Sequence, residues 1–208
     1  MLFDLDGTLY DSSEYSRHLE EEIARVVSEE LSIDKGHAVV LLKRKRKEIG
    51  TLTRTIESLG IDRKLFYKKI STRVEPRLYI SPNPTIQQTI RQLKQIGFGI
   101  GLVSNSGREL VEKILGAIGV EAALFDTIVT SNEAKPKPSP EPYLLAVENL
   151  GCNRNEAVYV GDREEAELRP ARELGLKTVL VSAEKRKSEW ADAIVTNISQ
   201  LPNVLIRG

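Results

Sequence analysis

From about residue 83 onward, the chain alternates between short apolar runs and longer segments with apolar residues at helical spacing. Runs of three or four apolar residues between turn-forming residues are typical of strands buried on both faces of a sheet. Such runs lie at 100–103, 127–130, 157–160, 178–181 and 193–195, and helical stripes at about 84–96, 110–118, 143–150 and 168–174 separate them. This alternation predicts an α/β fold, with a Rossmann-like parallel sheet that carries helices on both faces.

Residues 12–74 show a different pattern, because their apolar residues recur only at helical spacing and form no strand-like run. Asp34 and Asp62 each precede a helical stripe and are candidate N-caps. Asp11 is followed three positions later by Glu14, which resembles a capping box. We therefore expect several helices here, the first with Asp11 as its N-cap.

This helical segment interrupts the α/β pattern directly after the first apolar run of the chain. The sequence therefore predicts a core domain made of residues 1–11 and 77–208, and an inserted all-helical cap domain of residues 12–76. An insertion after a strand end lies where α/β folds bind their ligands.

Composition and charge exclude several classes of protein. The 208 residues include 30 Lys plus Arg and 30 Asp plus Glu, so no net charge favours nucleic acid or a membrane surface as a partner. No apolar run approaches the roughly 20 residues of a membrane span, and no secretory signal is visible, so a cytoplasmic protein is expected. The oligomeric state is left open. The single cysteine is consistent with neither a disulfide nor a cysteine metal cluster.

One stretch, residues 43–47, is entirely basic (Lys-Arg-Lys-Arg-Lys). Five consecutive residues cover all sides of a helix, so the first interpretation is a solvated helix surface. The alternatives are attraction of an anionic substrate and, less favoured because no aromatic residues are interleaved, a nucleic-acid patch.

Two carboxylates follow the first apolar run, Met1 to Phe3, at positions 4 and 6. They can converge only if the strand breaks next to them, and Gly7 tolerates the positive φ that such a break requires. Two carboxylates held close repel each other unless a cation or a proton is shared. Mg²⁺ prefers oxygen ligands and is the simplest counter-ion for Asp4 and Asp6.

Other polar residues also follow the carboxyl ends of predicted strands. Ser104 and Asp162 stand directly after apolar strands, as Asp4 does, and Lys137 lies in the loop that follows another strand. Each alone could be a turn former, a solvated charge or a helix cap. Because ligands of α/β folds bind at the carboxyl ends of the strands, we expect all four at one edge.

Four segments of this sequence together resemble the motifs of the haloacid dehalogenase-like (HAD) superfamily. They are Phe3 to Leu9, Val103 to Asn105, Lys137 to Tyr143, and Val160 to Glu167. The resemblance implies the α/β fold predicted above and a helical cap of the C1 type. The residues around Tyr10 and between Leu59 and Tyr67 are also similar to pyrimidine 5′-nucleotidase-type members.

The resemblance further implies roles for the matching residues. Asp4 would be the nucleophile toward phosphorus and Asp6 the general acid and base. Ser104, Asn105 and Lys137 would bind the phosphoryl group. Lys135 also precedes a proline and is the rival of Lys137.

The fourth motif implies a metal site. Asp162 would bind Mg²⁺ together with Asp4 and the backbone carbonyl of Asp6. The second carboxylate of that motif, usually Asp, is here Glu167, with Glu165 as a rival.

These assignments predict the reaction. Dehalogenases of the superfamily lack the second Asp and its P-type ATPases carry Thr there, so Asp6 favours a phosphatase or phosphomutase. We expect a Mg²⁺-dependent phosphatase acting on a small phosphate monoester, a nucleotide or sugar phosphate, through an aspartyl-phosphate. The alternatives are a phosphomutase of the same fold and a non-catalytic protein that binds phosphorylated metabolites. Tyr10 and Arg163 could belong either to the site entrance or to the surface.

Overall fold

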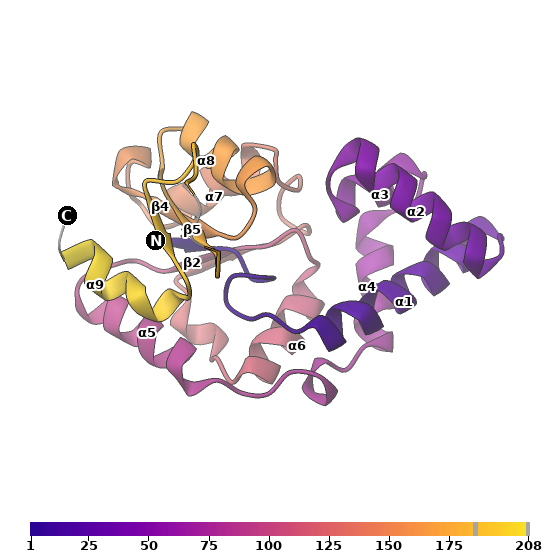
Figure 1. Cartoon of the computed structure of the whole chain (residues 1–208), viewed down its shortest axis with the longest axis horizontal. Coiled ribbons are helices and arrows are strands. Elements are labelled where there is room, and N and C mark those ends of the chain that lie inside the picture. Colours follow the sequence, from indigo (N-terminus) through magenta and orange to yellow (C-terminus); the bar gives the residue numbers. More distant parts are fainter. Residues whose placement is uncertain (185–186, 207–208) are drawn as a thin grey trace.

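The computed structural model describes residues 1–184 and 187–206 and contains one six-stranded sheet (Figure 1). All strand pairs are parallel, in the order β3-β2-β1-β4-β5-β6. The strands are β1 (Leu2–Phe3), β2 (Gly101–Val103), β3 (Thr127–Val129), β4 (Val158–Gly161), β5 (Lys177–Val181) and β6 (Ala193–Val195). The predicted parallel sheet is confirmed, and β1, which carries Asp4 at its end, lies between β2 and β4.

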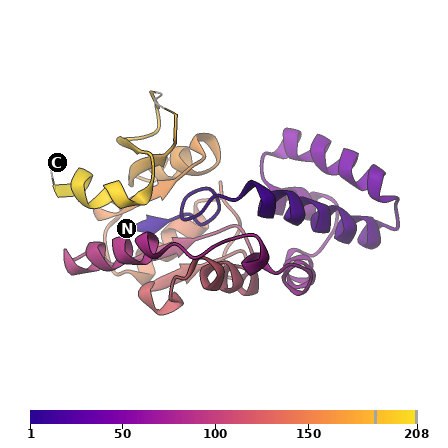
Figure 2. The ribbon, with the colours of Figure 1, turned by 60° about the horizontal axis from the view of Figure 1, so that its bottom comes forward.

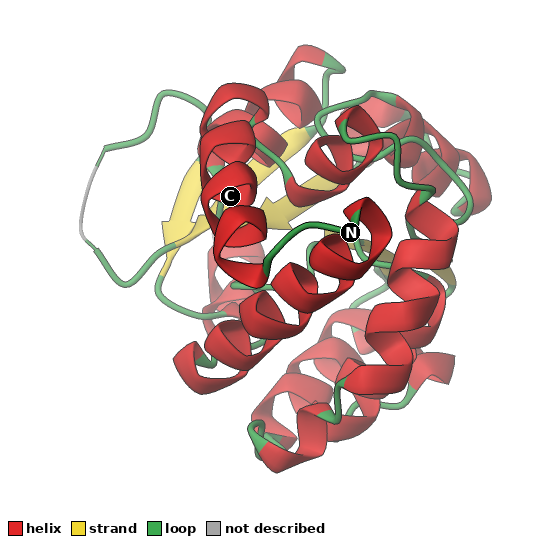
Figure 3. Cartoon of the chain, turned by 90° about the vertical axis from the view of Figure 1, so that its right-hand side faces the viewer, coloured by secondary structure: helices red, strands yellow, loops and turns green. Residues whose placement is uncertain are grey.

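Helices cover both faces of the sheet, as Figure 3 shows. Neighbouring strand residues point to opposite faces, so Leu2 packs with the helices α7 (Glu141–Asn149) and α8 (Arg169–Glu173), while Phe3 packs in the opposite cluster. The helices on that side are α5 (Pro84–Gln95), α6 (Arg108–Ile118) and α9 (Leu201–Ile206). Burial on both sides explains why the central residues of the strands are mostly apolar.

Four helices between β1 and α5 form a separate group beside the sheet (Figures 1 and 2). They are α1 (Ser13–Leu31), α2 (Lys35–Ile49), α3 (Leu52–Ser58) and α4 (Arg63–Arg73). Asp34 and Asp62 are N-caps, as predicted, because their carboxylates accept hydrogen bonds from backbone amides. The prediction for Asp11 is wrong: Ser12 is the N-cap of α1, and its hydroxyl accepts from the Tyr15 amide.

The C-terminal half differs from the sequence expectation in one place that matters for function. The helix expected near 168–174 begins earlier, as one turn of π-helix, η4 (Glu164–Leu168), that continues into α8. A π-turn contains one residue more than an α-turn, so it changes which side chains face the sheet. The short α9 had no clear pattern in the sequence.

The basic run lies on α2 and is mostly exposed, which agrees with a solvated helix surface. Arg46 is its one member that lines a cavity next to the carboxylates of the sheet edge. No helix of the described chain combines the length and apolarity that a membrane span requires.

Candidate active site

The carboxyl ends of the central strands bring three of the predicted residues to one edge of the sheet. Asp4 follows β1, Ser104 follows β2 and Asp162 follows β4. The sheet hydrogen bonds continue into this edge, because the Asp4 amide donates to Val160 O (2.9 Å) and the Ser104 amide donates to Val129 O (2.9 Å). The residues are therefore fixed by the sheet rather than by flexible loops.

The backbone turns sharply directly after Asp6. Gly7 has φ +83°, and a Cβ at this position would lie 2.7 Å from Cγ of Asp162. Only glycine therefore combines this turn with the close approach of Asp162. The Gly7 amide donates to Tyr10 O (2.9 Å), and the Tyr10 hydroxyl donates to Oδ1 of Asp6. The predicted break is present, and it places Tyr10 at the site rather than on the surface.

Lys137 is completely buried, and its ammonium group contacts the nucleophile candidate directly. Nζ lies 2.5 Å from Asp4 Oδ1, 3.1 Å from Glu167 Oε1, 2.8 Å from the Tyr159 hydroxyl and 3.1 Å from Val103 O. Lys135, by contrast, has a side chain that is 71% exposed and pairs with Glu141. The structure thus brings Lys137, and not Lys135, to the site.

The two candidate glutamates of the fourth motif have different surroundings. Glu167 is fully buried, and Arg163 donates to its Oε1 from Nη2 (2.7 Å) and Nε (3.2 Å). Glu165 has a side chain that is 69% exposed and pairs with Arg169. The π-turn η4 turns Glu167 toward the sheet edge, so the structure does not bring Glu165 into the site.

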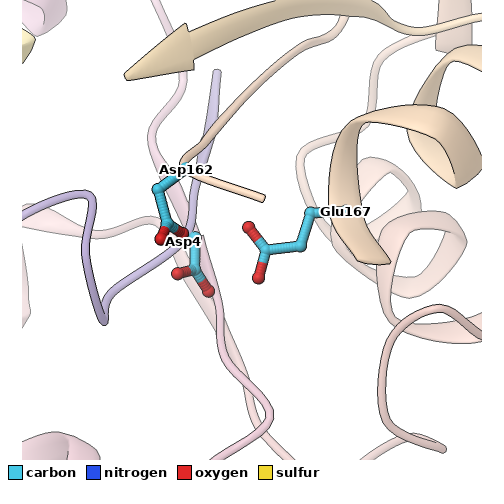
Figure 4. Close-up of side chains that lie close together, drawn as sticks. All are labelled: Asp4, Asp162 and Glu167. Atoms are coloured by element: carbon cyan, nitrogen blue, oxygen red, sulfur yellow. The ribbon is translucent and has the colours of Figure 1, made fainter. Parts of the chain in front are cut away.

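Asp4, Asp162 and Glu167 converge on one point (Figure 4). One carboxylate oxygen from each lies within 4.8 Å of the others. Within residues 1–184 and 187–206, Oδ2 of Asp4, Oδ1 of Asp162 and Oε2 of Glu167 are buried and accept no hydrogen bond. Buried anionic oxygens without partners are costly, and a hard divalent cation with oxygen ligands would satisfy them. The residues present therefore fit a metal ion.

Burial and mutual repulsion shift the proton affinities of these groups. Burial, followed by repulsion from Glu167, raises the pKa of Asp4 to about 8, and burial raises the pKa of Asp162 to about 6. Burial also raises the pKa of Asp6. Burial opposes ionisation of Glu167, but the charges of Lys137 and Arg163 outweigh it and lower the Glu167 pKa. Glu167 therefore ionises more readily than a solvated Glu, while Asp6 keeps its proton to a higher pH than a solvated Asp does.

Ser104 and Asn105 lie beside Lys137. The Ser104 side chain is buried, and its Oγ accepts from the Ser106 amide (3.1 Å). The carboxamide of Asn105 contacts the backbone of Lys137, since Oδ1 accepts from Lys137 N (2.7 Å) and Nδ2 donates to Lys137 O (2.9 Å). Asn105 also lines the cavity beside the carboxylates, so phosphate binding by Asn105 stays a prediction.

A cavity of about 360 Å³ opens between this edge and the helices α1 to α4. Its walls come from both parts of the chain, including Asp6, Asp162, Arg163, Tyr15, Leu19, Arg46, Thr53 and Tyr67. Thr53 and Tyr67 are not among the site residues predicted from the sequence, because none of the four motifs includes them. Tyr159 was also missed, since in β4 it matches the pattern of a core residue.

Comparison with known proteins identifies the family. The model of the family described as haloacid dehalogenase-like hydrolase matches residues 1–181. The chain belongs to this family. The HAD resemblance deduced from the four motifs is thereby confirmed, and the four sets of motif residues are those that meet at the sheet edge.

Two curated relatives of this HAD hydrolase are named as phosphatases of small phosphorylated compounds. A glyceraldehyde 3-phosphate phosphatase of Methanocaldococcus jannaschii is 28% identical over 221 residues, covering 99% of this chain and 96% of the relative. A phosphoglycolate phosphatase of Aquifex aeolicus is 33% identical over 188 residues, covering 86% and 83%. These relatives confirm the predicted enzyme class, a phosphatase of the HAD superfamily. Neither is named as a nucleotidase, so the likeness to pyrimidine 5′-nucleotidases stays a prediction.

Solved structures confirm the fold. A HAD phosphatase of Thermococcus onnurineus superposes with a TM-score of 0.73 at 23% identity, covering 98% of this chain and 96% of that one. A 2-haloacid dehalogenase of Pseudomonas syringae superposes with a TM-score of 0.67 at 22% identity, covering 99% and 97%. Because phosphatase and dehalogenase share this architecture, the reaction has to be argued from the site residues.

Proposed function

We propose that this HAD-family chain is a Mg²⁺-dependent phosphatase that hydrolyses a small phosphate monoester through a phosphorylated Asp4. The observation that carries the proposal is the contact between the buried Asp4 carboxylate and the Lys137 ammonium, 2.5 Å apart, with Asp6 two residues further on at the cavity wall. A nucleophile, its counter-charge and a separate proton carrier are the parts that phosphoryl transfer by two covalent steps requires.

In the first step, a carboxylate oxygen of Asp4 attacks phosphorus and the bond between phosphorus and the ester oxygen breaks. Lys137 favours the ionised Asp4 that this attack needs. The pKa of Asp6 is raised by burial, so it can deliver its proton to the departing ester oxygen. The Tyr10 hydroxyl donates to Oδ1 of Asp6, which leaves Oδ2 to carry that proton.

In the second step, water attacks the phosphorus of the aspartyl-phosphate and gives a proton to Asp6, which is then ready for another cycle. The phosphate leaves, and Asp4 returns to a carboxylate. Ser104 would bind the phosphoryl oxygens through its hydroxyl and Lys137 through its positive charge.

Asp4, Asp162 and Glu167 would hold the cation through the buried oxygens that have no hydrogen-bond partner. A bound Mg²⁺ would supply positive charge against the transferred phosphoryl oxygens and the nucleophile.

The size of the cavity and the substrates named for the relatives support a small substrate. A volume of about 360 Å³ lies at the small end of the range for ligand pockets, roughly 300–1,000 Å³. The relatives named above act on esters of small carbon skeletons, which supports a small phosphorylated metabolite, such as a sugar phosphate, over a polymer. We interpret residues 12–76 as the cap domain over a core of 1–11 and 77–208. A cytoplasmic location stays a prediction.

The test is release of inorganic phosphate from separate solutions of glyceraldehyde 3-phosphate, phosphoglycolate and a nucleoside monophosphate, with Mg²⁺ and with EDTA. We expect release with Mg²⁺ from at least one ester and none with EDTA. Turnover that requires an added bisphosphate would indicate a phosphomutase instead. Calorimetric binding of these esters without any turnover would indicate a binding protein and contradict the proposal.

The raised pKa values of Asp4 and Asp162 predict how Mg²⁺ and pH together affect the stability of the protein. In the metal-free protein the pKa values of Asp4 (about 8) and Asp162 (about 6) exceed that of an unfolded Asp, about 3.9. Their contribution to stability is therefore lost as the pH rises through 6 and 8. Mg²⁺ competes with these protons, so its stabilising effect should grow over the same range.

Thermal unfolding at pH 6 and pH 8, each with EDTA and with Mg²⁺, measures this. We expect a larger increase in Tm on adding Mg²⁺ at pH 8 than at pH 6. Asp162→Asn, which removes one of the anionic ligands, should abolish most of that increase. An equal increase in Tm at both pH values would contradict the assignment of the metal ligands.

A further inference from the structure

A hydrogen-bonded path leads from the helical segment to the lysine of the active site. Thr53, on α3, is completely buried, and its hydroxyl donates to the backbone carbonyl of Asn105 (3.0 Å). Its Oγ1 also lies 2.7 Å from the hydroxyl of Tyr67 on α4. Because the single hydroxyl proton of Thr53 is used on the carbonyl, Tyr67 is the donor of the second bond. Thr53 thus joins two helices to the loop after β2.

Asn105 continues this path toward Lys137. Its carboxamide bonds both polar backbone atoms of Lys137, at 2.7 Å to the amide and 2.9 Å to the carbonyl. These two bonds fix the backbone from which the Lys137 side chain extends to Asp4. A displacement of Asn105 would therefore move the base of Lys137 and change the position of its ammonium group against the nucleophile.

We propose that Thr53 is a positioning residue that makes the placement of Lys137, and hence phosphoryl transfer, depend on the docking of α3 and α4 against the core. The inference rests on the proposed phosphatase function. It differs from a role in substrate binding, although Thr53 also lines the cavity. A positioning role lowers kcat for every ester, whereas a substrate contact raises KM for some esters and not for others.

The chain contains a matched control in the same helix. Thr55 is as completely buried as Thr53, but its hydroxyl donates to the Thr51 carbonyl within its own segment (2.8 Å). Replacing either threonine by valine keeps the β-branched shape and removes one hydroxyl. Only the Thr53 change breaks a bond to the core.

The experiment measures kcat and KM with Mg²⁺ for two esters with different leaving groups, p-nitrophenyl phosphate and phosphoglycolate. For Thr53→Val we expect kcat to fall about 10- to 100-fold for both esters, because small displacements of catalytic groups have effects of this order, while any change in KM is the same for both esters. Thr53→Ser, which keeps the hydroxyl, and Thr55→Val should stay within about threefold of the unmodified protein.

Two results would overturn the inference: equal kcat values for Thr53→Val and Thr55→Val, or a loss in Thr53→Ser as large as in Thr53→Val. If Thr53→Val does not fold, Thr53→Ala compared with Thr53→Ser gives the same contrast. An increase in KM for only one ester would assign Thr53 to substrate binding instead.

A binding measurement separates this inference from the proposed function. Titration calorimetry with inorganic phosphate and Mg²⁺ needs no turnover, and misplacement of Lys137 should weaken phosphate binding in Thr53→Val but not in Thr55→Val. If the unmodified protein hydrolyses no ester, the proposed function fails and the phosphate titration still tests the role of Thr53. Equal phosphate affinities in the two variants would then refute it.

Discussion

Replacing Asp4 by Asn should lower kcat by on the order of 10⁴-fold or more, the scale seen when a catalytic nucleophile is removed. The change keeps the size of the side chain but takes away the anionic oxygen that attacks phosphorus. It also removes one of the two carboxylates that pair with the buried Lys137, which keeps Glu167 as its counter-charge, so the metal-free variant should lose less stability than Lys137→Met.

Phosphate release under saturating ester, together with thermal unfolding in EDTA, measures both effects. Asp62→Asn is a suitable control, because Asn also serves as an N-cap and the residue is exposed at the start of α4. Its kcat should equal that of the unmodified protein. Substantial turnover in Asp4→Asn would exclude Asp4 as the nucleophile.

Replacing Lys137 by Met should have the largest effect on stability, because the ammonium group is the buried counter-charge of both Asp4 and Glu167. Removing one partner of a buried ion pair costs about 3–5 kcal/mol. Arg163 still pairs with Glu167, so Asp4 is the carboxylate that is left without a counter-charge. Without the lysine the pKa of Asp4 rises further, and kcat at neutral pH should fall with it.

The free energy of unfolding from urea titration and kcat at pH 7 measure this prediction. Lys135→Met is the matched control, two residues away, because its ammonium group lies on the surface and pairs only with Glu141 among the described contacts. Surface pairs of this kind contribute about 0–1 kcal/mol. Similar losses in the two variants would contradict the assignment of Lys137.

Much of the site could be predicted because parallel strands end at a common edge. Asp4, Ser104 and Asp162 each directly follow a strand, so a correct prediction of the sheet already placed them together. The choice between Lys135 and Lys137 depends on the path of a proline-rich loop. The resemblance favoured Lys137, and the contacts of the two side chains agree with it. The choice between Glu165 and Glu167 depends on the π-turn, which hydrophobic periodicity at 3.6 residues does not reveal.

The contacts between the helical segment and the core could not be predicted. Thr53 and Asn105 are distant in sequence, and a buried threonine in a short helix has no pattern that distinguishes it from Thr55. The predicted N-cap of α1 was wrong by one residue, because Asp and Ser are both common N-caps. A tertiary contact of Ser12 selects it over Asp11. The Ser12 hydroxyl also donates to Tyr79 O (3.0 Å), which fixes Ser12 at the helix start.

The most direct test of the phosphatase account is to find the phosphoryl group on Asp4. Asp6→Ala removes the group that activates water, so a phosphorylated protein should accumulate when this variant is mixed with p-nitrophenyl phosphate and Mg²⁺ and quenched in acid. Peptide mass spectrometry should then show one phosphoryl group on the peptide that contains Asp4. A phosphoryl group on another residue, or turnover of the unmodified protein with no phosphorylated peptide in the variant, would contradict covalent catalysis by Asp4.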